Sequence, residues 1–303
     1  MYIQFFPTFR CNESCSFCFN RGITRMPDIG IEDFRKISTI LIDKGCNEID
    51  MLGGEPTLHP DLMSLVELAS KKGFKISISS NGSNVPLLRE LSKNFGRDRL
   101  TIGISLNDMP INDRLTEYIV NWKPLLKSVC SKSRLLPENA AHLLAKEGID
   151  YYAIYMDAIN LTDLSNCLPF PVYFNKLKEV SALYDNIREV YCSCFSTDSQ
   201  NVSGLDSVRC PAGITKLSIM PDGSTYPCYL LFQRPEFMLG NILSDDLDRI
   251  LRHPALSLLR NFEGNSCSNA ECNFYSKCKG GCPAVSLMTY GNLKAPDPRC
   301  RTG

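Results

Sequence analysis

Short apolar runs alternate with helical patterns over the first half of the chain, and this alternation narrows the possible folds more than any other feature. The runs have the length and composition of buried strands: YIQFF, EIDML, KISIS, TIGISL, a weaker SRLL, and YYAIYM. Of the helical patterns between them, residues 31–44 are the clearest, and others begin near Leu62, Val85 and Asn139. Strand–helix units in series favour parallel strands wound right-handedly, and six units suit an open α/β barrel better than a closed eight-fold one.

The composition of the sequence and its pattern of apolar residues change after about Val190. Strand-like runs become scarce, turn signals such as PDG, GN and KGG multiply, and cysteines crowd together, as in a small module organised by metal. A helical pattern from Phe174 to Ile187 would be the last element of the first domain. We therefore expect two domains, residues 1–190 and residues 191–303.

Composition argues against several classes of partner. The chain of 303 residues has 33 Lys and Arg against 33 Asp and Glu, so no net charge attracts it to nucleic acid or to an anionic membrane. Its first residues, MYIQFFPTFR, lack the segments of an export signal, and no run of about 18 apolar residues suggests a membrane span. We therefore expect a cytoplasmic protein. In that reducing compartment its 15 cysteines favour metal ligands or catalytic groups over disulfides.

Three of these cysteines, Cys11, Cys15 and Cys18, stand at C-x3-C-x2-C spacing directly after the first predicted strand. Active sites of barrels lie at the carboxyl ends of the strands, where this loop falls. Thiolates are soft ligands, and three from one loop can hold three irons of a [4Fe–4S] cube and leave the fourth iron open. The alternatives are three incidental thiols, or a zinc site, which would need a further ligand when the nearest histidine is His59.

The same spacing, with the aromatic Phe17 before the last cysteine, resembles the radical S-adenosylmethionine (SAM) family. The resemblance implies a partial (β/α)6 TIM-like barrel in which the amino and carboxylate groups of SAM chelate the open iron. It also implies that an electron from the cluster cleaves SAM to methionine and a 5′-deoxyadenosyl radical, which removes a hydrogen atom from the substrate. Cys11, Cys15 and Cys18 would then be the catalytic cluster ligands.

A second match to the family is the turn GGEP that follows the strand EIDML. Two glycines let a backbone approach a ligand closely, although such a turn alone is also an ordinary lead into a helix. In the family this turn binds the SAM amino group, and a serine after the fourth strand often contacts the ribose. The SAM-binding residues implied here are Gly53, Gly54, Glu55, Pro56, Asn81 and Ser105. For Asn81-Gly82 the alternative is a simple turn.

Seven cysteines mark the second domain, with Gly223 five positions before Cys228 and the string CKGGCP near the end. This pattern resembles the SPASM extension of radical SAM enzymes, which holds two auxiliary iron–sulfur clusters. By that resemblance the outer cluster would take Cys267, Cys272, Cys278 and Cys300, and the inner cluster Cys210, Cys228 and Cys282. One departure is the spacing of Cys267 and Cys272, which have four residues between them where the family usually has two.

The inner cluster lacks a fourth ligand in this pattern. Cys192 and Cys194 are the candidates, and we favour Cys194 because it is nearer in sequence to Cys210. The alternatives are two free thiols in a linker and an iron left open for a substrate thiolate. Together with the first site, the implied cofactors are three [4Fe–4S] clusters and SAM. The cysteines that fit no cluster pattern would be small buried hydrophobes: Cys46, Cys130 and Cys167.

Two auxiliary clusters favour an enzyme that oxidatively modifies a peptide or protein side chain, for example by thioether or carbon–carbon crosslinking. Crosslinking releases an electron that such clusters can accept. Sulfatase-maturing members have an Asp where this chain has Tyr229, so formylglycine formation is less favoured and a packed aromatic is the simpler role for Tyr229.

The resemblance also bears on partners. We expect an electron donor such as a ferredoxin or flavodoxin, and no nucleic acid or membrane. Because the chain begins at its first strand, a peptide leader would be bound without a separate N-terminal recognition domain. The alternatives are a radical SAM dehydrogenase or epimerase acting on a small molecule, and an iron–sulfur protein that transfers electrons without catalysis.

Overall fold

The computed structural model describes residues 1–23, 26–107, 111–132, 143, 149–190, 210–232, 234–267, 271–272 and 275–300. The chain divides into two compact units, each built from segments that are far apart in sequence. The first unit joins Met1–Leu126 to Ala212–Ser257, and the second joins Lys127–Pro211 to Leu258–Gly303. The domain boundary predicted after residue 190 adjoins residues outside the described ranges and stays a prediction.

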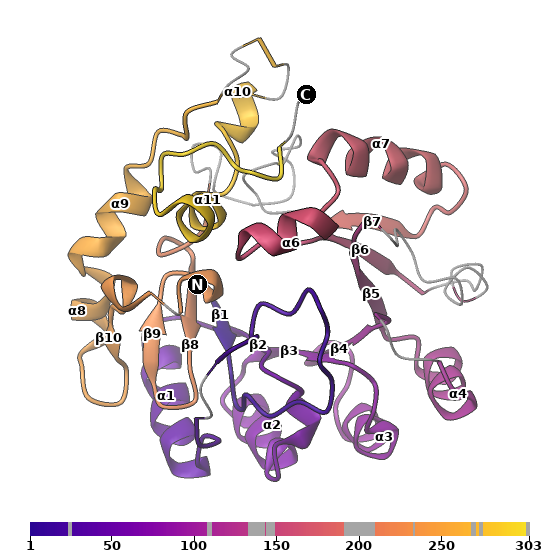
Figure 1. Ribbon diagram of the computed structural model, residues 1–303. Coiled ribbons are helices and arrows are strands. Elements are labelled where there is room, and N and C mark those ends of the chain that lie inside the picture. Colours follow the sequence, from indigo (N-terminus) through magenta and orange to yellow (C-terminus); the bar gives the residue numbers. More distant parts are fainter. Residues whose placement is uncertain are drawn as a thin grey trace. The chain divides into compact units, whose positions relative to one another are not determined.

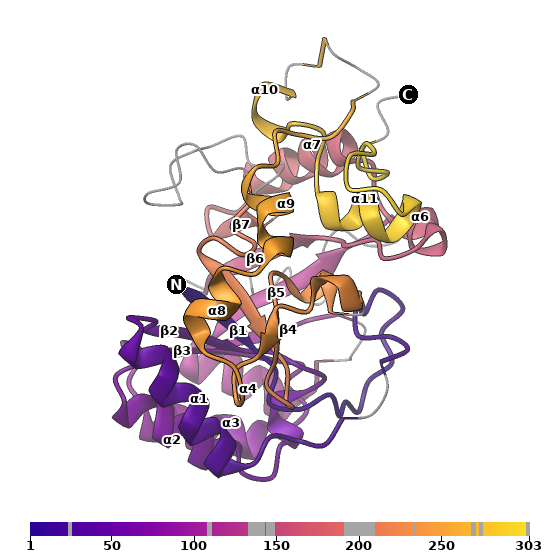
Figure 2. The same cartoon turned by 90° about the vertical axis from the view of Figure 1, so that its left-hand side faces the viewer.

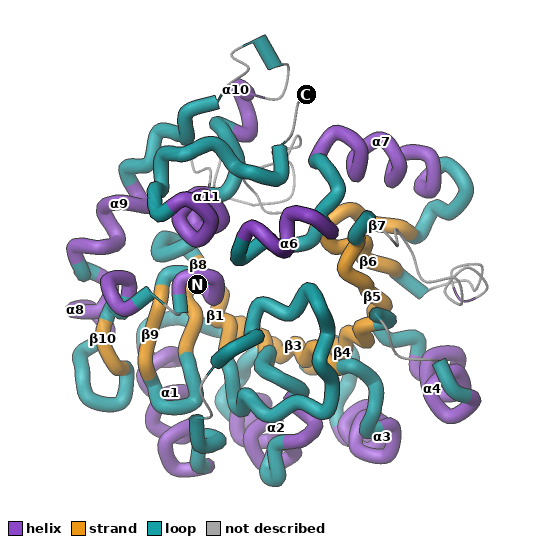
Figure 3. Tube along the Cα trace, in the orientation of Figure 1, coloured by secondary structure: helices purple, strands orange, loops and turns teal. Residues whose placement is uncertain are grey.

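A sheet in the order β10-β9-β8-β1-β2-β3-β4 forms the framework of the first unit (Figures 1 and 3). Its strands are β1 (Tyr2–Phe5), β2 (Glu48–Met51), β3 (Lys75–Ser80), β4 (Leu100–Ser105), β8 (Lys216–Ile219), β9 (Ser224–Tyr226) and β10 (Gly240–Asn241). Strands β1 to β4 are parallel, β8 pairs in parallel with the other edge of β1, and β9 and β10 continue antiparallel. The carboxyl ends of β1 to β4 therefore lie along one edge of the sheet.

Each of the first four strands is followed by a helix, as the alternation predicts. The helices are α1 (Ile31–Asp43), α2 (Leu62–Lys71), α3 (Val85–Asn94) and α4 (Asp113–Trp122), with a 3-10 turn η1 (Pro56–Leu58) before α2. Figures 1 and 2 show α1, α2 and α3 on one face of the sheet. The ring centroids of Phe5 and Phe34 lie 5.1 Å apart, and both side chains are fully buried. Burial of this apolar face against the helices stabilises the unit.

The remaining short helices of the first unit are η4 (Tyr229–Leu231), η5 (Pro235–Phe237), α8 (Leu247–Leu251) and η6 (Pro254–Leu256). The chain passes from the first unit to the second within strand β5 (Leu125–Cys130), returns to the first unit between Pro211 and Ala212, and passes to the second unit again within helix α9 (Ser257–Arg260). The second unit has parallel strands β6 (Tyr151–Tyr155) and β7 (Ile187–Val190), and helices α6 (Leu161–Asn166), α7 (Phe170–Ser181), α10 (Tyr275–Cys278) and α11 (Pro283–Tyr290).

Two elements differ from the sequence analysis. The strand after the fourth helix is β5 (Leu125–Cys130), whereas the predicted run SRLL lies outside the described residues. Helix α4 ends at Trp122, and its C-cap residue Lys123 has the left-handed φ of 45°. Pro124 then leads directly into β5. The helix predicted to continue to Ile187 ends at Ser181, and Ile187 instead begins β7 beside β6.

The segment after Cys210 also has more strand than its turn-rich sequence suggests, because β8 finds a partner in β1. Within the described ranges, no helix has both the length and the apolar composition needed to cross a membrane.

Candidate functional site

The predicted cysteine triplet lies on the loop that follows β1. Cys11 is exposed, and Cys15 and Cys18 are partly exposed. The backbone N–H of Cys18 donates to the carbonyl of Cys15 at 3.1 Å, and the N–H of Glu13 donates to the Sγ of Cys11 at 3.4 Å. The loop thus turns tightly around its cysteines and leaves all three thiols accessible to a ligand.

The surroundings of Cys11 favour its neutral thiol. Burial is the largest cause of its raised pKa, the hydrogen bond from Glu13 lowers it, and the charges of Glu55 and Cys18 raise it further. A bound cation would offset the negative charges of Glu55, Cys18 and Glu13, all of which raise the pKa of Cys11. Three soft donors on one loop, in a setting that calls for positive charge, fit an iron–sulfur cluster.

The GGEP turn that follows β2 is hydrogen-bonded to the cysteine loop. The N–H of Glu55 donates to the carbonyl of Arg10 at 2.7 Å, and the side-chain amide of Asn20 donates to the carbonyl of Gly53 at 2.7 Å. A Cβ on Gly54 would lie 2.2 Å from the carbonyl oxygen of Arg10. The second glycine therefore serves the close approach of two backbone segments of this chain.

This close approach predicts that Gly54→Ala is severe. The new Cβ would also lie 2.6 Å from the carbonyl carbon of Arg10, and backbone atoms cannot rotate away, so the two loops must separate. We expect SAM cleavage to fall by about 100-fold, the effect of a displacement of about 1 Å at a reaction centre. Release of 5′-deoxyadenosine measures it. Gly30→Ala is the control, because nothing lies within 4 Å of a Cβ there and its φ is −76°; equal rates in the two variants would contradict the argument.

The carboxylate of Glu55 joins the end of β2 to the end of β3. One oxygen accepts hydrogen bonds from the N–H and hydroxyl of Thr57, at 3.1 and 2.6 Å, and from the hydroxyl of Ser80 at 2.8 Å. The other accepts from the N–H of Asn81 at 2.6 Å. Glu55 is only 1% exposed, so this buried carboxylate links the ends of β2 and β3 through its hydrogen bonds. We call it the bracket between the two strands.

Asn81 connects the end of β3 to the cysteine loop. Its side-chain amide donates to Asn12 at 2.8 Å, and its side-chain oxygen accepts from the N–H of Ser83 at 3.0 Å. Asn12 directly follows Cys11, so the structure brings Asn81 to the predicted site. Ser105 is the last residue of β4 and is partly exposed, and its contact with a ribose stays a prediction.

The sequence analysis missed Asn12 and Asn20. Both are in the cysteine loop, and their side-chain contacts fasten that loop to the ends of β2 and β3. Single asparagines in a loop carry no periodicity or spacing that marks them. Their positions beside Cys11 and near Cys18 were the only available signal.

The four cysteines assigned to the outer auxiliary cluster lie close together in the second unit. Burial, and then the charges of Cys278, Asp297, Cys267 and Cys272, raise the pKa of Cys300 to about 12. Burial is also the main cause of the raised pKa of Cys278, and Cys267 and Cys272 contribute to it. The charges of these thiols thus act on one another, and their role as ligands stays a prediction.

The cysteines assigned to the inner cluster are divided between the units. Cys210 and Cys282 belong to the second unit and Cys228 to the first. Cys228 and Cys282 are buried, and Cys210 is partly exposed. Cys192 and Cys194 lie outside the described residues, so the fourth ligand also stays a prediction.

Aromatic rings connect the cysteine loop to the segment after Cys228 in the first unit. The ring centroids of Phe19 and Tyr229 lie 4.4 Å apart, and those of Phe9 and Phe232 lie 5.3 Å apart. The ammonium of Lys216 is 5.8 Å from the centroid of the Tyr229 ring. Tyr229 is therefore a packed aromatic, as expected.

The remaining cysteines, Cys46, Cys130 and Cys167, are buried. Burial raises the pKa of Cys130 to about 12 and that of Cys167 to about 11, as for thiols within a core. In the part of the chain that the structure describes, no three Cys, His, Asp or Glu side chains are placed to share one metal ion. A [4Fe–4S] cube makes no such demand, because each iron takes its own thiolate.

Two family models match the chain. Residues 5–115 match the radical SAM superfamily, and residues 210–283 match the SPASM iron–sulfur cluster-binding domain. The first match contains the cysteine triplet and the GGEP turn, and the second contains six of the seven C-terminal cysteines assigned above, from Cys210 to Cys282.

Individual relatives match almost the whole chain. The antilisterial bacteriocin subtilosin biosynthesis protein AlbA of Bacillus subtilis is 23% identical over 311 residues, which cover 93% of this chain and 67% of AlbA. The mycofactocin maturase MftC of Mycolicibacterium smegmatis is 24% identical over 98% of this chain and 81% of its own. The crystal structure of Streptococcus suis SuiB bound to its precursor peptide SuiA has a TM-score of 0.74 at 19% identity and covers 99% of this chain and 75% of SuiB. The predicted fold class, a radical SAM barrel followed by a SPASM domain, is confirmed.

Proposed function

The chain belongs to the radical SAM superfamily and carries a SPASM iron–sulfur domain, and we propose that it is an enzyme that oxidatively modifies a side chain of a peptide or protein. A thioether or carbon–carbon crosslink is the modification we favour. The observation that carries the proposal is the hydrogen-bonded assembly of three strand ends: the cysteine loop after β1, the GGEP turn after β2 and Asn81 after β3. Relatives named for subtilosin and mycofactocin, and SuiB solved with a precursor peptide, support a peptide substrate.

We assign Cys11, Cys15 and Cys18 to a [4Fe–4S] cluster that, when reduced, supplies the electron for cleavage of SAM to the 5′-deoxyadenosyl radical. The chain's own residues orient SAM. The Glu55 carboxylate already accepts four hydrogen bonds from Thr57, Ser80 and Asn81, so we assign the SAM ammonium to backbone carbonyls of the GGEP turn. Ser105, at the end of β4, is assigned to the ribose.

The proposed auxiliary clusters are assigned as the resemblance to the SPASM extension implies. The outer one takes Cys267, Cys272, Cys278 and Cys300, whose proximity supports the assignment. The inner one takes Cys210, Cys228 and Cys282, with Cys194 as the favoured fourth ligand. A ferredoxin or flavodoxin supplies electrons, and we place the protein in the cytoplasm, where its 15 cysteines stay reduced.

Iron content tests the assignment of three clusters. Anaerobically reconstituted protein should hold about 12 irons per chain, because three [4Fe–4S] cubes are assigned. Iron and sulfide assays, with electron paramagnetic resonance of the reduced protein, measure this. A fully loaded chain with only about four irons would show that the auxiliary clusters are wrongly assigned.

The activity itself is tested with a peptide encoded beside the gene, in particular one rich in Cys, Thr or aromatic residues. The reduced enzyme with SAM should release 5′-deoxyadenosine and leave the peptide lighter by two hydrogen atoms, the change expected for a crosslink. Mass spectrometry of the product, with a sample lacking SAM as control, measures both. Cleavage of SAM without any change in candidate peptides, together with turnover of a small alcohol or sugar, would favour a dehydrogenase or epimerase instead.

A further inference from the structure

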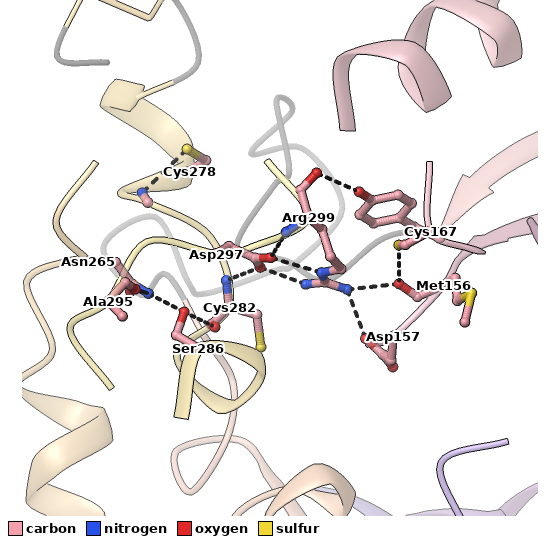
Figure 4. A network of polar contacts seen from close by, with 12 residues as sticks. Met156, Asp157, Cys167, Asn265, Cys278, Cys282, Ser286, Ala295, Asp297 and Arg299 are labelled. Atoms are coloured by element: carbon pink, nitrogen blue, oxygen red, sulfur yellow. Dashed lines mark hydrogen bonds and ion pairs between the residues drawn. The ribbon is translucent and has the colours of Figure 1, made fainter. Parts of the chain in front are cut away.

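A fully buried arginine in the second unit binds polar groups on several sides (Figure 4). Arg299 is 1% exposed, and its Nε and Nη2 donate to the two carboxylate oxygens of Asp297 at 3.0 and 2.8 Å. Its Nη1 donates to the carbonyl of Met156 at 3.1 Å and to Asp157 at 3.0 Å. The ring of Tyr155 lies 5.0 Å from the guanidinium carbon. Two carboxylates, a carbonyl and a ring thus compensate a cation that has lost its water.

Asp297 also accepts hydrogen bonds from the backbone of two of the predicted cluster ligands. Its carboxylate accepts from the backbone N–H of Cys282 at 2.8 Å, and its backbone carbonyl accepts from the N–H of Cys300 at 3.0 Å. In the assignment above, Cys282 belongs to the inner auxiliary cluster and Cys300 to the outer one. One buried aspartate therefore holds the backbone of a ligand of each.

The packing around these contacts leaves little freedom. Gly281 has φ of +86°, and a Cβ there would lie 2.2 Å from the Cβ of Asp297, so the backbone before Cys282 lies directly against the aspartate. On the other side, Ser286 donates to the carbonyl of Cys282 at 3.0 Å and accepts from Asn265 at 2.7 Å. The loop at Cys282 is thus fixed from both sides.

We propose that Asp297 and Arg299 are positioning residues for both auxiliary clusters: Arg299 locks the Asp297 carboxylate in the orientation that holds Cys282, and the backbone carbonyl of Asp297 holds Cys300. This inference rests on the cluster assignment in the proposed function. The bidentate pair fixes both oxygens of Asp297, and groups that orient metal ligands in this way govern metal affinity and potential.

A simpler role for Asp297 would be to neutralise the charge of Arg299. Asp157 separates the two possibilities, because it pairs with the same cation at the end of β6. Asp157→Asn removes one negative charge from Arg299 and leaves the bonds from Asp297 to Cys282 and Cys300 in place. Asp297→Asn removes the same charge, and its NH2 group must face a donor, because each carboxylate oxygen of Asp297 accepts two hydrogen bonds.

The experiment compares reconstituted wild type, Asp297→Asn and Asp157→Asn by iron content, by resonance of the auxiliary clusters and by the rate of iron loss to a chelator. Asp297→Asn should lose iron at least about tenfold faster than wild type and show an altered signal from the inner auxiliary cluster, because the carboxylate binds Cys282 whereas the carbonyl that binds Cys300 is retained. Asp157→Asn should match wild type. In both variants the first cluster should keep its spectral response to SAM, which reports that the first unit is folded.

Arg299→Lys is the second variant, in case Asp297→Asn does not fold. Lysine keeps the charge but lacks the fork that holds both carboxylate oxygens, so a milder change of the same inner-cluster signal is expected. Equal behaviour of Asp297→Asn and Asp157→Asn, with wild type fully loaded, would overturn the positioning role and leave the proposed function intact. A wild type without auxiliary clusters would overturn both.

Discussion

A chain in which Cys11, Cys15 and Cys18 are all replaced by alanine should make no 5′-deoxyadenosine above background and should keep about eight of about 12 irons. The three thiols are on one loop of the first unit, whereas the four thiols assigned to the outer cluster lie in the second unit. Loss of the first set therefore removes the electron source for SAM cleavage without removing any assigned auxiliary ligand. Product analysis after reduction and addition of SAM, together with an iron assay, measures both effects.

Cys46→Ala is the matched control for this variant. Cys46 is 2% exposed and follows α1 in the same unit, but it belongs to no assigned cluster. It should keep wild-type iron and product formation. A triple variant that still cleaves SAM at the wild-type rate would rule out the proposed radical site.

Glu55→Gln should have the second largest effect, on both stability and SAM cleavage. The four donors around Glu55 all point at a carboxylate, so the NH2 group of glutamine must face at least one of them. A buried donor left without a partner, together with weaker bonds to a neutral acceptor, should lower the free energy of unfolding by about 2–4 kcal/mol. SAM cleavage should fall as well, because the ends of β2 and β3 lose their bracket.

Denaturant unfolding of the anaerobic protein and SAM turnover test this expectation. Glu67→Gln is the control: Glu67 is 48% exposed and its ion pair with Lys71 spans 3.7 Å, so the change should cost less than about 1 kcal/mol. If Glu55→Gln were as mild as Glu67→Gln, Glu55 would not be the bracket between the two strands.

Strands β1 to β4 could be predicted because each is a short run whose apolar residues are largely buried. Ile3 and Phe5 of β1, for example, are both fully buried. The pairing of β8 with β1 could not be predicted, since nothing local in the sequence KLSI identifies its partner. Strand β5 was missed because the turn before it lacks the usual glycine or asparagine. Helix α4 leads through Lys123, which has a left-handed backbone conformation, and through Pro124 directly into the strand.

The candidate site divides in the same way. The sequence alone points to the cysteine triplet and the GGEP turn, because each has a fixed local spacing that resembles the radical SAM pattern: Cys11, Cys15 and Cys18 for the triplet, and residues 53–56 for the turn. Other residues of the two sites could not be recognised from the sequence, because their roles depend on contacts with residues distant in sequence or with loop backbone. These residues are Asn12, Asn20, Asp297 and Arg299. Such contacts depend on the tertiary fold and leave no local pattern.

The pairing of β1 with β8 has a consequence for how the chain folds during synthesis. Tyr2 pairs with Lys216, so during synthesis one edge of β1 waits for a partner more than two hundred residues later in the chain. Contacts of such long sequence separation form slowly, and an open strand edge invites pairing with other chains. The apolar strand YIQF therefore keeps an open edge until β8 has been made, and we expect chaperones to protect it over that interval.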